Sequence, residues 1–147
     1  MNPQEVVSRF FTAFYERDWA LIPTFFADEA VYWDVPLGPQ QAARGGADIV
    51  KRVQGPIGPL ASFDDRRHRQ LVDGETVVTE HDEIWVWRSG ESVILPVMSL
   101  HVVREELIVQ WKDYWDFQTL LSGAPPTWIE ELASGDMSWV YDASGEA

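Results

Sequence analysis

Apolar side chains recur at helical spacing near the start of the chain. Asn2 and Pro3 are typical of a helix N-terminus, and Glu5 follows in the first turn. The apolar positions after them keep the three- and four-residue spacing of one helix face, namely Val6, Val7, Phe10, Phe11 and Phe14. We therefore expect a first helix here, and Asp18 predicts the start of a second, shorter helix that runs to about Ala27.

The pattern then changes to that of strands. A short strand is predicted at residues 30–35, a loop rich in Pro and Gly at 36–45, and a short helix at 47–53. After residue 60, four strands are predicted, at residues 63–72, 75–87, 92–103 and 107–117. Asp73-Gly74 is a hairpin turn signal between the first two of them. We expect the four to form an antiparallel meander.

The last part of the chain has its own signals. Pro125-Pro126 ends the sheet region, and Thr127 to Glu130 has the sequence of a capping box that begins a last short helix. Residues 142–147 are expected to form a loose acidic tail. Helices first and a meander afterwards predict an α+β domain, with N-terminal helices packed on one face of a curved sheet.

Composition and charge limit the function classes. The 147 residues suffice for one domain, and 46% of them are apolar. The net charge of -13 argues against binding to nucleic acid or to an anionic membrane surface. The chain has no cysteine, which excludes disulfides, zinc–thiolate sites and a cysteine nucleophile. The sequence has neither a signal peptide nor a run of ~18 apolar residues, so we expect a cytoplasmic protein.

Strand alternation puts three polar side chains on one otherwise apolar face. His81 and Glu83 are odd positions of the strand at 75–87, and Asp113 interrupts the apolar odd positions of the strand at 107–117. A carboxylate on such a face is costly unless it is paired or hydrogen-bonded. When two carboxylates lie close together in an apolar site, their pKa values move apart. One group then keeps its proton and can act as an acid, while the other is ionised and can act as a base. The sequence thus predicts an acid–base site in which His81 bridges the two carboxylates.

Apolar and aromatic neighbours on the same strands are predicted to bind the substrate. They are Trp111, Trp85, Leu95, Val97, Trp115 and His101. Core packing is the alternative for the tryptophans and for both histidines. Both faces of the strand at 92–103 are apolar, which predicts that a helix or a partner subunit covers the second face. A metal site would have suitable ligand types but no spacing signature, so we expect neither a metal nor a cofactor.

Four segments resemble the limonene-1,2-epoxide hydrolase family, which lies within the NTF2-like (SnoaL-like) superfamily. They are Ala30–Pro36, Thr79–Glu83, Leu95–Met98 and Trp111–Asp116. The resemblance runs from about residue 3 to about residue 120. It implies an NTF2-like cone over residues 1–121, a C-terminal extension of the same domain over 122–147, and a homodimer.

The resemblance also implies a one-step hydrolysis. Asp113 would activate a water that Tyr32 helps to hold, and Glu83 would protonate the epoxide oxygen. The sequence departs from the family at three positions: Asp34 stands where the family has Asn, His81 where it has Arg, and Glu83 where it has Asp. Arg is permanently charged, whereas His loses its proton near neutral pH. If a protonated His81 bridges the carboxylates, activity is expected to fall as the pH rises.

Three functions remain open at this point. The first is an epoxide hydrolase that adds water to an apolar terpenoid or aromatic epoxide and gives a vicinal diol. The second is a dehydratase, lyase or isomerase that uses His81, Asp34 and Tyr32 as acid–base groups on an apolar hydroxy or carbonyl compound. The third is a binding or dimerisation module without catalysis. The expected partners are a small apolar substrate, water and a second copy of the chain.

Overall fold

The N-terminal helix forms where the apolar spacing predicts it. A computed structural model describes residues 1–146, and in it helix α1 spans Pro3–Tyr15. The Asn2 side chain caps it by accepting a hydrogen bond from the backbone N–H of Glu5 at 2.9 Å. The buried face contains all five predicted apolar positions.

A six-stranded sheet carries the rest of the fold. Its strands are β1 (Phe26–Asp34), β2 (Ala43–Arg44), β3 (Ser62–Asp73), β4 (Thr76–Val86), β5 (Ser92–Arg104) and β6 (Leu107–Tyr114). They lie in the order β2-β1-β6-β5-β4-β3. Strands β3 to β6 form the predicted antiparallel meander, while β1 runs parallel to β6. The predicted α+β class and the mixed, mostly antiparallel sheet are confirmed.

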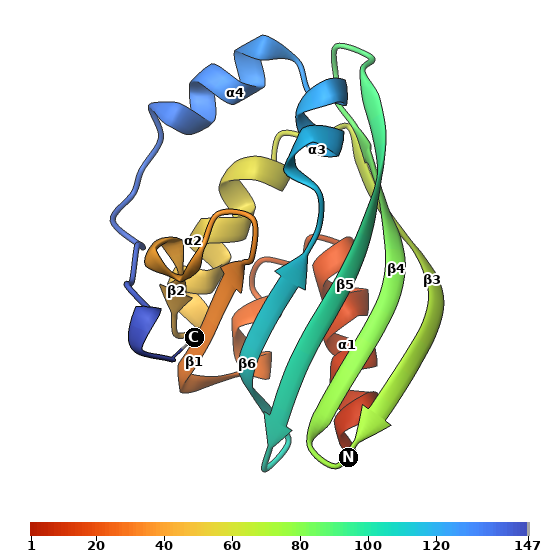
Figure 1. Cartoon of the computed structure of the whole chain (residues 1–147), viewed down its shortest axis with the longest axis vertical. Helices are drawn as coiled ribbons and strands as arrows, with labels where there is room; N and C mark the ends of the chain where they lie inside the picture. The colour runs from red at the N-terminus through yellow and green to blue at the C-terminus, as the bar shows by residue number, and fades with distance from the viewer. Residues whose placement is uncertain (147) are drawn as a thin grey trace.

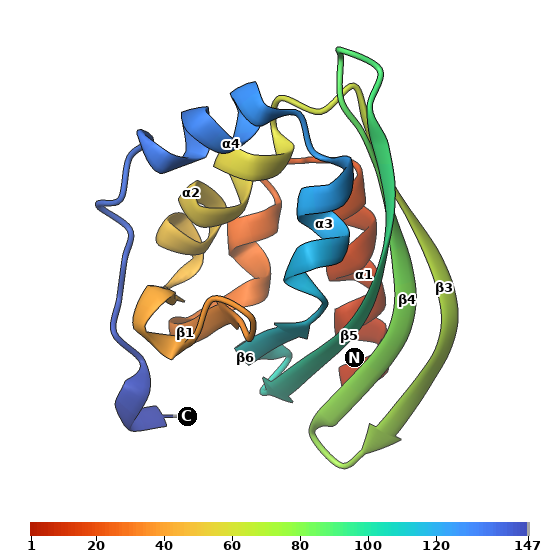
Figure 2. The same ribbon diagram turned by 45° about the horizontal axis from the view of Figure 1, so that its top comes forward.

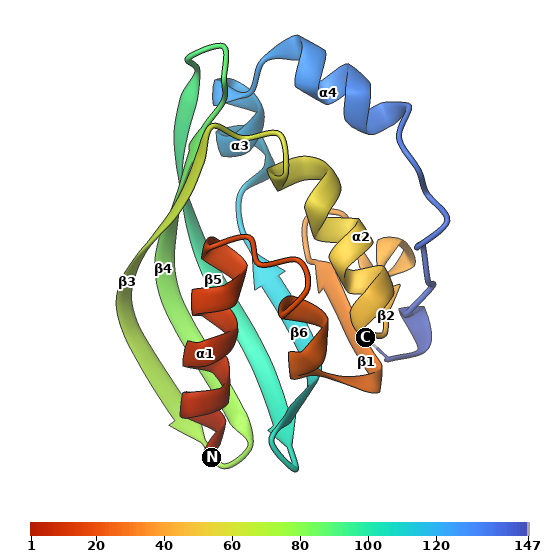
Figure 3. The same ribbon diagram turned by 180° about the vertical axis from the view of Figure 1, so that it is seen from behind.

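Helices cover the concave side of this sheet. Besides α1 they are α2 (Gly46–Ile57), α3 (Phe117–Gly123) and α4 (Pro126–Ala133). The long strands curve around α1, and α4 lies at one end of the molecule (Figures 1 and 2). Seen from behind, α1 covers β3 to β5 and α2 lies beside β1 and β2 (Figure 3). Within residues 1–146, none of the helices has both the length and the apolar character needed to cross a membrane.

The two faces of the central strands differ sharply. The odd positions of β4 and β5 are buried under the helices, from Val77 to Trp85 and from Leu95 to Val103. The even positions of β5 face outward, and Ile94 is 53% exposed. The second apolar face of this strand, which the sequence predicted to be covered, is therefore open to solvent in the single chain.

Two predictions for the first half of the chain need correction. The helix expected from Asp18 to about Ala27 is wrong, because only a 3-10 turn at Ile22–Phe25 forms. Asp18 accepts the backbone N–H of Leu21 as a cap does, but Phe26 already pairs with Ile108 of β6 and begins β1. In contrast, the helix expected at 47–53 continues through Gly55-Pro56 to Ile57 as α2.

The C-terminal predictions are corrected as well. Strand β6 stops at Tyr114, and Asp116 then caps the unpredicted helix α3 by accepting the N–H of Thr119 at 2.9 Å. The capping box is wrong, since α4 already begins at Pro126, the N1 position at which a missing N–H costs nothing.

The acidic tail is ordered over its described residues. The backbone N–H of Tyr141 donates to the carbonyl of Ala42 at 2.8 Å, and Ala143 is fully buried. A 3-10 turn at Ser144–Glu146 follows, while residue 147 of the predicted tail lies outside the described residues. The prediction of a loose tail is therefore wrong for residues 142–146.

Candidate active site

A cavity of about 550 Å³ lies between the inner face of the sheet, α2 and the C-terminal residues. Its lining includes most of the side chains predicted for the site, namely Tyr32, Asp34, Glu83, Trp85, Leu95, Asp113 and Trp115. Helix α4 adds an apolar wall that contains Trp128, Ile129 and Leu132. The Nε1 of Trp128 donates to the carbonyl of Pro56 at 2.9 Å, which ties α4 to α2. The extension after residue 121 thus forms part of the cavity.

Asp113 lies on β6 at the inner wall of the cavity and is 6% exposed. Its Oδ1 accepts two hydrogen bonds, from Ser99 Oγ at 2.6 Å and from Trp111 Nε1 at 2.7 Å. Burial raises the pKa of Asp113 well above its usual range, and the charges of Asp34 and Glu83 raise it further. The hydrogen bond from Ser99 opposes this shift. Such a carboxyl suits proton transfer near neutral pH.

Glu83 lies on β4 and lines the same cavity. Tyr15 donates its hydroxyl proton to Oε2 at 2.8 Å, and Trp85 Nε1 donates to Oε1 at 3.2 Å. Burial raises the pKa of Glu83 to about 7, although both hydrogen bonds favour the ionised form. A carboxyl with this pKa can supply a proton at neutral pH.

Asp34 ends β1 and has a different set of partners. Its Oδ2 accepts from Arg52 at 2.7 Å and from the Tyr32 hydroxyl at 2.7 Å. Its Oδ1 accepts from Trp115 Nε1 at 2.9 Å. Burial and the Asp34 charge raise the pKa of Tyr32 well above its usual value, so this phenol keeps its proton. Asp34 is therefore held by one ion pair, with Arg52, and by two neutral donors.

His81 lies behind the cavity rather than in its lining, and is 1% exposed. Its Nε2 is 2.8 Å from Ser99 Oγ, and its Nδ1 is 2.7 Å from Asp65 Oδ1 and 3.3 Å from the Tyr15 hydroxyl. The predicted bridge between the carboxylates is thus indirect. Ser99 connects the ring to Asp113, and Tyr15 connects it to Glu83.

Three other predicted residues lie outside the cavity lining. Trp111 reaches Asp113 from the core, and its ring stacks on that of Tyr32 with 3.8 Å between centroids. Val97 is buried in the core. His101 packs between aromatic rings, and neither of its nitrogens has a hydrogen-bond partner among residues 1–146. Burial lowers the pKa of His101 to about 3, so the ring is neutral.

Sequence reasoning missed Tyr15, Arg52, Asp65 and Ser99. Ser99 is an odd position of β5 between buried neighbours, so the alternation that found His81 also pointed to Ser99. Asp65 pairs with Glu83 across β3 and β4, which strand register reveals only once the strands are aligned. Arg52 carried no signal, because the sequence did not fix where α2 lies relative to β1.

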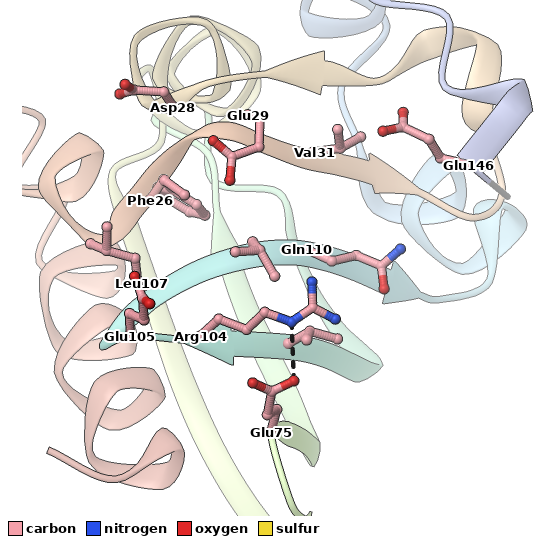
Figure 4. A pocket seen from close by; sticks show the side chains of 13 residues that line it. Phe26, Asp28, Glu29, Val31, Glu75, Arg104, Glu105, Leu107, Gln110 and Glu146 are labelled. Atoms are coloured by element: carbon pink, nitrogen blue, oxygen red, sulfur yellow. Dashed lines mark hydrogen bonds and ion pairs between the residues drawn. The ribbon is translucent and has the colours of Figure 1, made fainter.

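A larger hollow of about 860 Å³ lies on the outer face of the sheet (Figure 4). Carboxylates from several segments surround it, and Arg104 pairs with Glu75 there at 3.0 Å. None of the predicted site residues lines this hollow. Nor do any three His, Asp or Glu side chains converge as metal ligands in the part of the chain that the structure describes. The buried carboxyls Asp34, Glu83 and Asp113 line the inner cavity, which is therefore the candidate active site.

The match of a family model agrees with this architecture. The model described as a SnoaL-like domain matches residues 7–111, which is more than half of the chain. The chain belongs to the SnoaL-like domain family. Solved structures support the fold independently: a SnoaL-like polyketide cyclase of Shewanella putrefaciens has a TM-score of 0.74 at 15% identity and covers 82% of this chain and 84% of its own. The predicted NTF2-like cone is confirmed.

Two comparisons concern epoxide hydrolases. The epoxide hydrolase EphG of Mycobacterium tuberculosis is 27% identical over 123 residues, which make up 80% of this chain and 75% of EphG. The structure of an M. tuberculosis LEH-like epoxide hydrolase has a TM-score of 0.69 at 23% identity and covers 88% of this chain and 91% of its own. These matches confirm that this SnoaL-like chain resembles the limonene-1,2-epoxide hydrolase family.

Proposed function

We propose that the inner cavity hydrolyses an epoxide, with Asp113 as the base and Glu83 as the acid. One observation carries this proposal: two buried carboxyls with separate sets of hydrogen-bond donors line a single, largely apolar cavity. Such a pair suits a reaction that takes a proton on one side of a substrate and gives a proton on the other. The similarity to EphG supports the choice of reaction.

The proposed reaction is a single step. Asp113 takes a proton from a water through Oδ2, which accepts no hydrogen bond from residues 1–146. The water oxygen forms a bond to one epoxide carbon as the bond between that carbon and the epoxide oxygen breaks. Glu83 gives its proton to that oxygen. The product is a vicinal diol. Loss of the proton from Asp113 to solvent and uptake of one by Glu83 restore both carboxyls, so the net change is the addition of one water.

The cavity wall suggests the substrate class. Trp85, Trp115 and Trp128 contribute aromatic surface, and Leu95 adds aliphatic surface. Flat or bulky apolar molecules fit such walls by area burial. The proposed substrate is therefore an aromatic or terpenoid epoxide.

The lyase or isomerase alternative has one observation in its favour. Tyr32 donates to Asp34 within the same cavity, so this pair can hold or move a proton of a bound substrate. The burial of His81 weighs against its assigned role as the base in that reaction, since the ring lies outside the lining.

A homodimer remains a prediction, and the outward apolar side chains of β5 are its candidate surface.

Two variants test the proposed roles. Asp113→Asn and Glu83→Gln keep the size of each side chain and remove its proton transfer, so each is expected to lower diol formation about 10²- to 10⁴-fold. Asp116→Asn is the matched control, because Asp116 is an exposed helix cap whose role an amide can also perform. Near-normal diol formation in Asp113→Asn would contradict the proposal.

A further inference from the structure

A row of four side chains runs from the proposed base toward the edge of the sheet. Asp113 accepts from Ser99 at 2.6 Å, Ser99 Oγ is 2.8 Å from His81 Nε2, and His81 Nδ1 is 2.7 Å from Asp65. The register explains the first of these contacts, since Ser99 pairs directly with Asp113 across β5 and β6. His81 and Ser99 are 1% exposed, so the middle of the row is shielded from solvent.

With Asp65 ionised, the donor inventory allows two proton arrangements in this row. A hydroxyl has one proton to donate, a carboxylate only accepts, and an imidazole donates from both nitrogens only when it is charged. If Ser99 donates to an ionised Asp113, the Ser99 oxygen must accept from His81 Nε2. Nδ1 donates to Asp65 at the same time, so the ring is charged. If Asp113 holds a proton instead, it donates to Ser99, Ser99 donates to Nε2, and the ring is neutral.

Both arrangements contain the same number of protons and keep all three hydrogen bonds. They interconvert when a proton leaves the Asp113 carboxyl for Ser99 Oγ and the Ser99 hydroxyl proton moves to His81 Nε2. No proton is exchanged with solvent in this step. The ionised base therefore does not require a permanent cation beside it.

The surroundings of His81 decide which arrangement is favoured. The polar and titratable groups around the ring come from four elements: Tyr15 from α1, Asp65 and Arg67 from β3, Glu83 through Tyr15 from β4, and Ser99 and His101 from β5. Asp65 Oδ1 contacts the ring directly at 2.7 Å, and its Oδ2 is 3.7 Å from Arg67, the cross-strand partner of His81. His101 is neutral and adds no competing charge. A carboxylate in contact with Nδ1 stabilises the charged ring.

We propose that His81 takes the proton of Asp113 through Ser99, so that a buried proton relay of Asp65, His81 and Ser99 keeps the base ionised. This inference rests on the proposed role of Asp113 in the cavity. His81, Ser99 and Asp65 are positioning residues, because they act on the reaction only through Asp113. In this relay, a titratable ring keeps Asp113 ionised, which a permanently charged side chain would otherwise do.

Nitrogen-15 NMR of histidine-labelled protein tests the relay without a substrate. The chain has three histidines, and His68, which pairs with Asp82 on an exposed part of the sheet, is the internal control. At pH 7 we expect both nitrogens of His81 to carry protons in the wild type. In Ser99→Ala and Asp113→Asn one nitrogen should lose its proton, while the His68 signals stay unchanged. A neutral His81 ring in the wild type, or an equal protonation state in all three proteins, would overturn the relay.

Turnover gives an independent readout. Ser99→Ala is expected to move the rising limb of the pH profile of kcat/KM to higher pH by about one unit. At pH values below this limb kcat/KM should fall about tenfold, and at pH values above it kcat/KM should change little. Ser99→Thr retains the hydroxyl and should keep the wild-type limb. An equal loss at every pH would indicate a structural role and contradict the relay. If no epoxide is turned over at all, the proposed function fails, while the NMR comparison still decides on the relay.

Discussion

Two aspartates on neighbouring strands show how differently one cavity can treat the same side chain. Asp34 of β1 and Asp113 of β6 are register partners, and both are 6% exposed. Asp34 contacts the guanidinium of Arg52 at 2.7 Å. Among residues 1–146, the donors at hydrogen-bond distance from Asp113 are both neutral, Ser99 and Trp111, and burial raises the pKa of Asp113.

The difference lies in what compensates each buried charge. A guanidinium keeps its proton at any ordinary pH, so Asp34 has a permanent partner. Asp113 depends on neutral hydrogen-bond donors and on His81, which reaches it through Ser99. The protonation state of Asp113 can therefore change. A fixed charge suits orientation of bound groups, and a changeable one suits catalysis. Under the proposed function, Asp34 therefore positions bound groups and Asp113 transfers the proton.

Removal of the permanent cation has the largest expected effect on stability. Arg52→Met leaves Asp34 buried without its charged partner, which is expected to lower the free energy of unfolding by about 3–5 kcal/mol. Thermal or denaturant unfolding measures this loss. Lys51→Met on the same helix is the control, because the Lys51 side chain is exposed and its pair with Asp48 contributes little. If Arg52→Met and Lys51→Met are equally stable, the fixed ion pair is not the feature that separates the two aspartates.

Neutralisation of Asp34 should act on Asp113 in the opposite direction to loss of Ser99. The Asp34 charge raises the pKa of Asp113, so Asp34→Asn lowers that pKa. An ionised base is active above its pKa, and the rising limb of kcat/KM therefore moves to lower pH. A shift of about one pH unit raises kcat/KM about tenfold at pH values below the wild-type limb. The pH profile of the variant measures it, and a limb that moves upward would contradict the coupling of the two aspartates.

Much of the site could be predicted because strands alternate. His81, Glu83 and Asp113 project inward as the period of two requires, and Tyr32 and Asp34 follow from the resemblance. The partners that come from the helices could not be predicted, because they depend on how separate elements dock. Arg52 reaches Asp34 from α2, and Tyr15 reaches Glu83 from the end of α1. Local signals failed at residues 18–27, where pairing of β1 with β6 decides the structure. At α3 the cap at Asp116 is a local signal, and the prediction of a strand to residue 117 overlooked it.

Turnover of an apolar aromatic or terpenoid epoxide in ¹⁸O-labelled water tests the central claim most directly. The account predicts a vicinal diol that contains one labelled oxygen per molecule, formed by the wild type and by Asp116→Asn and lost in Asp113→Asn. Because the attacking oxygen comes from water, the label enters with every turnover. A product that forms without oxygen from the water would contradict hydrolysis and would favour the lyase or isomerase reaction.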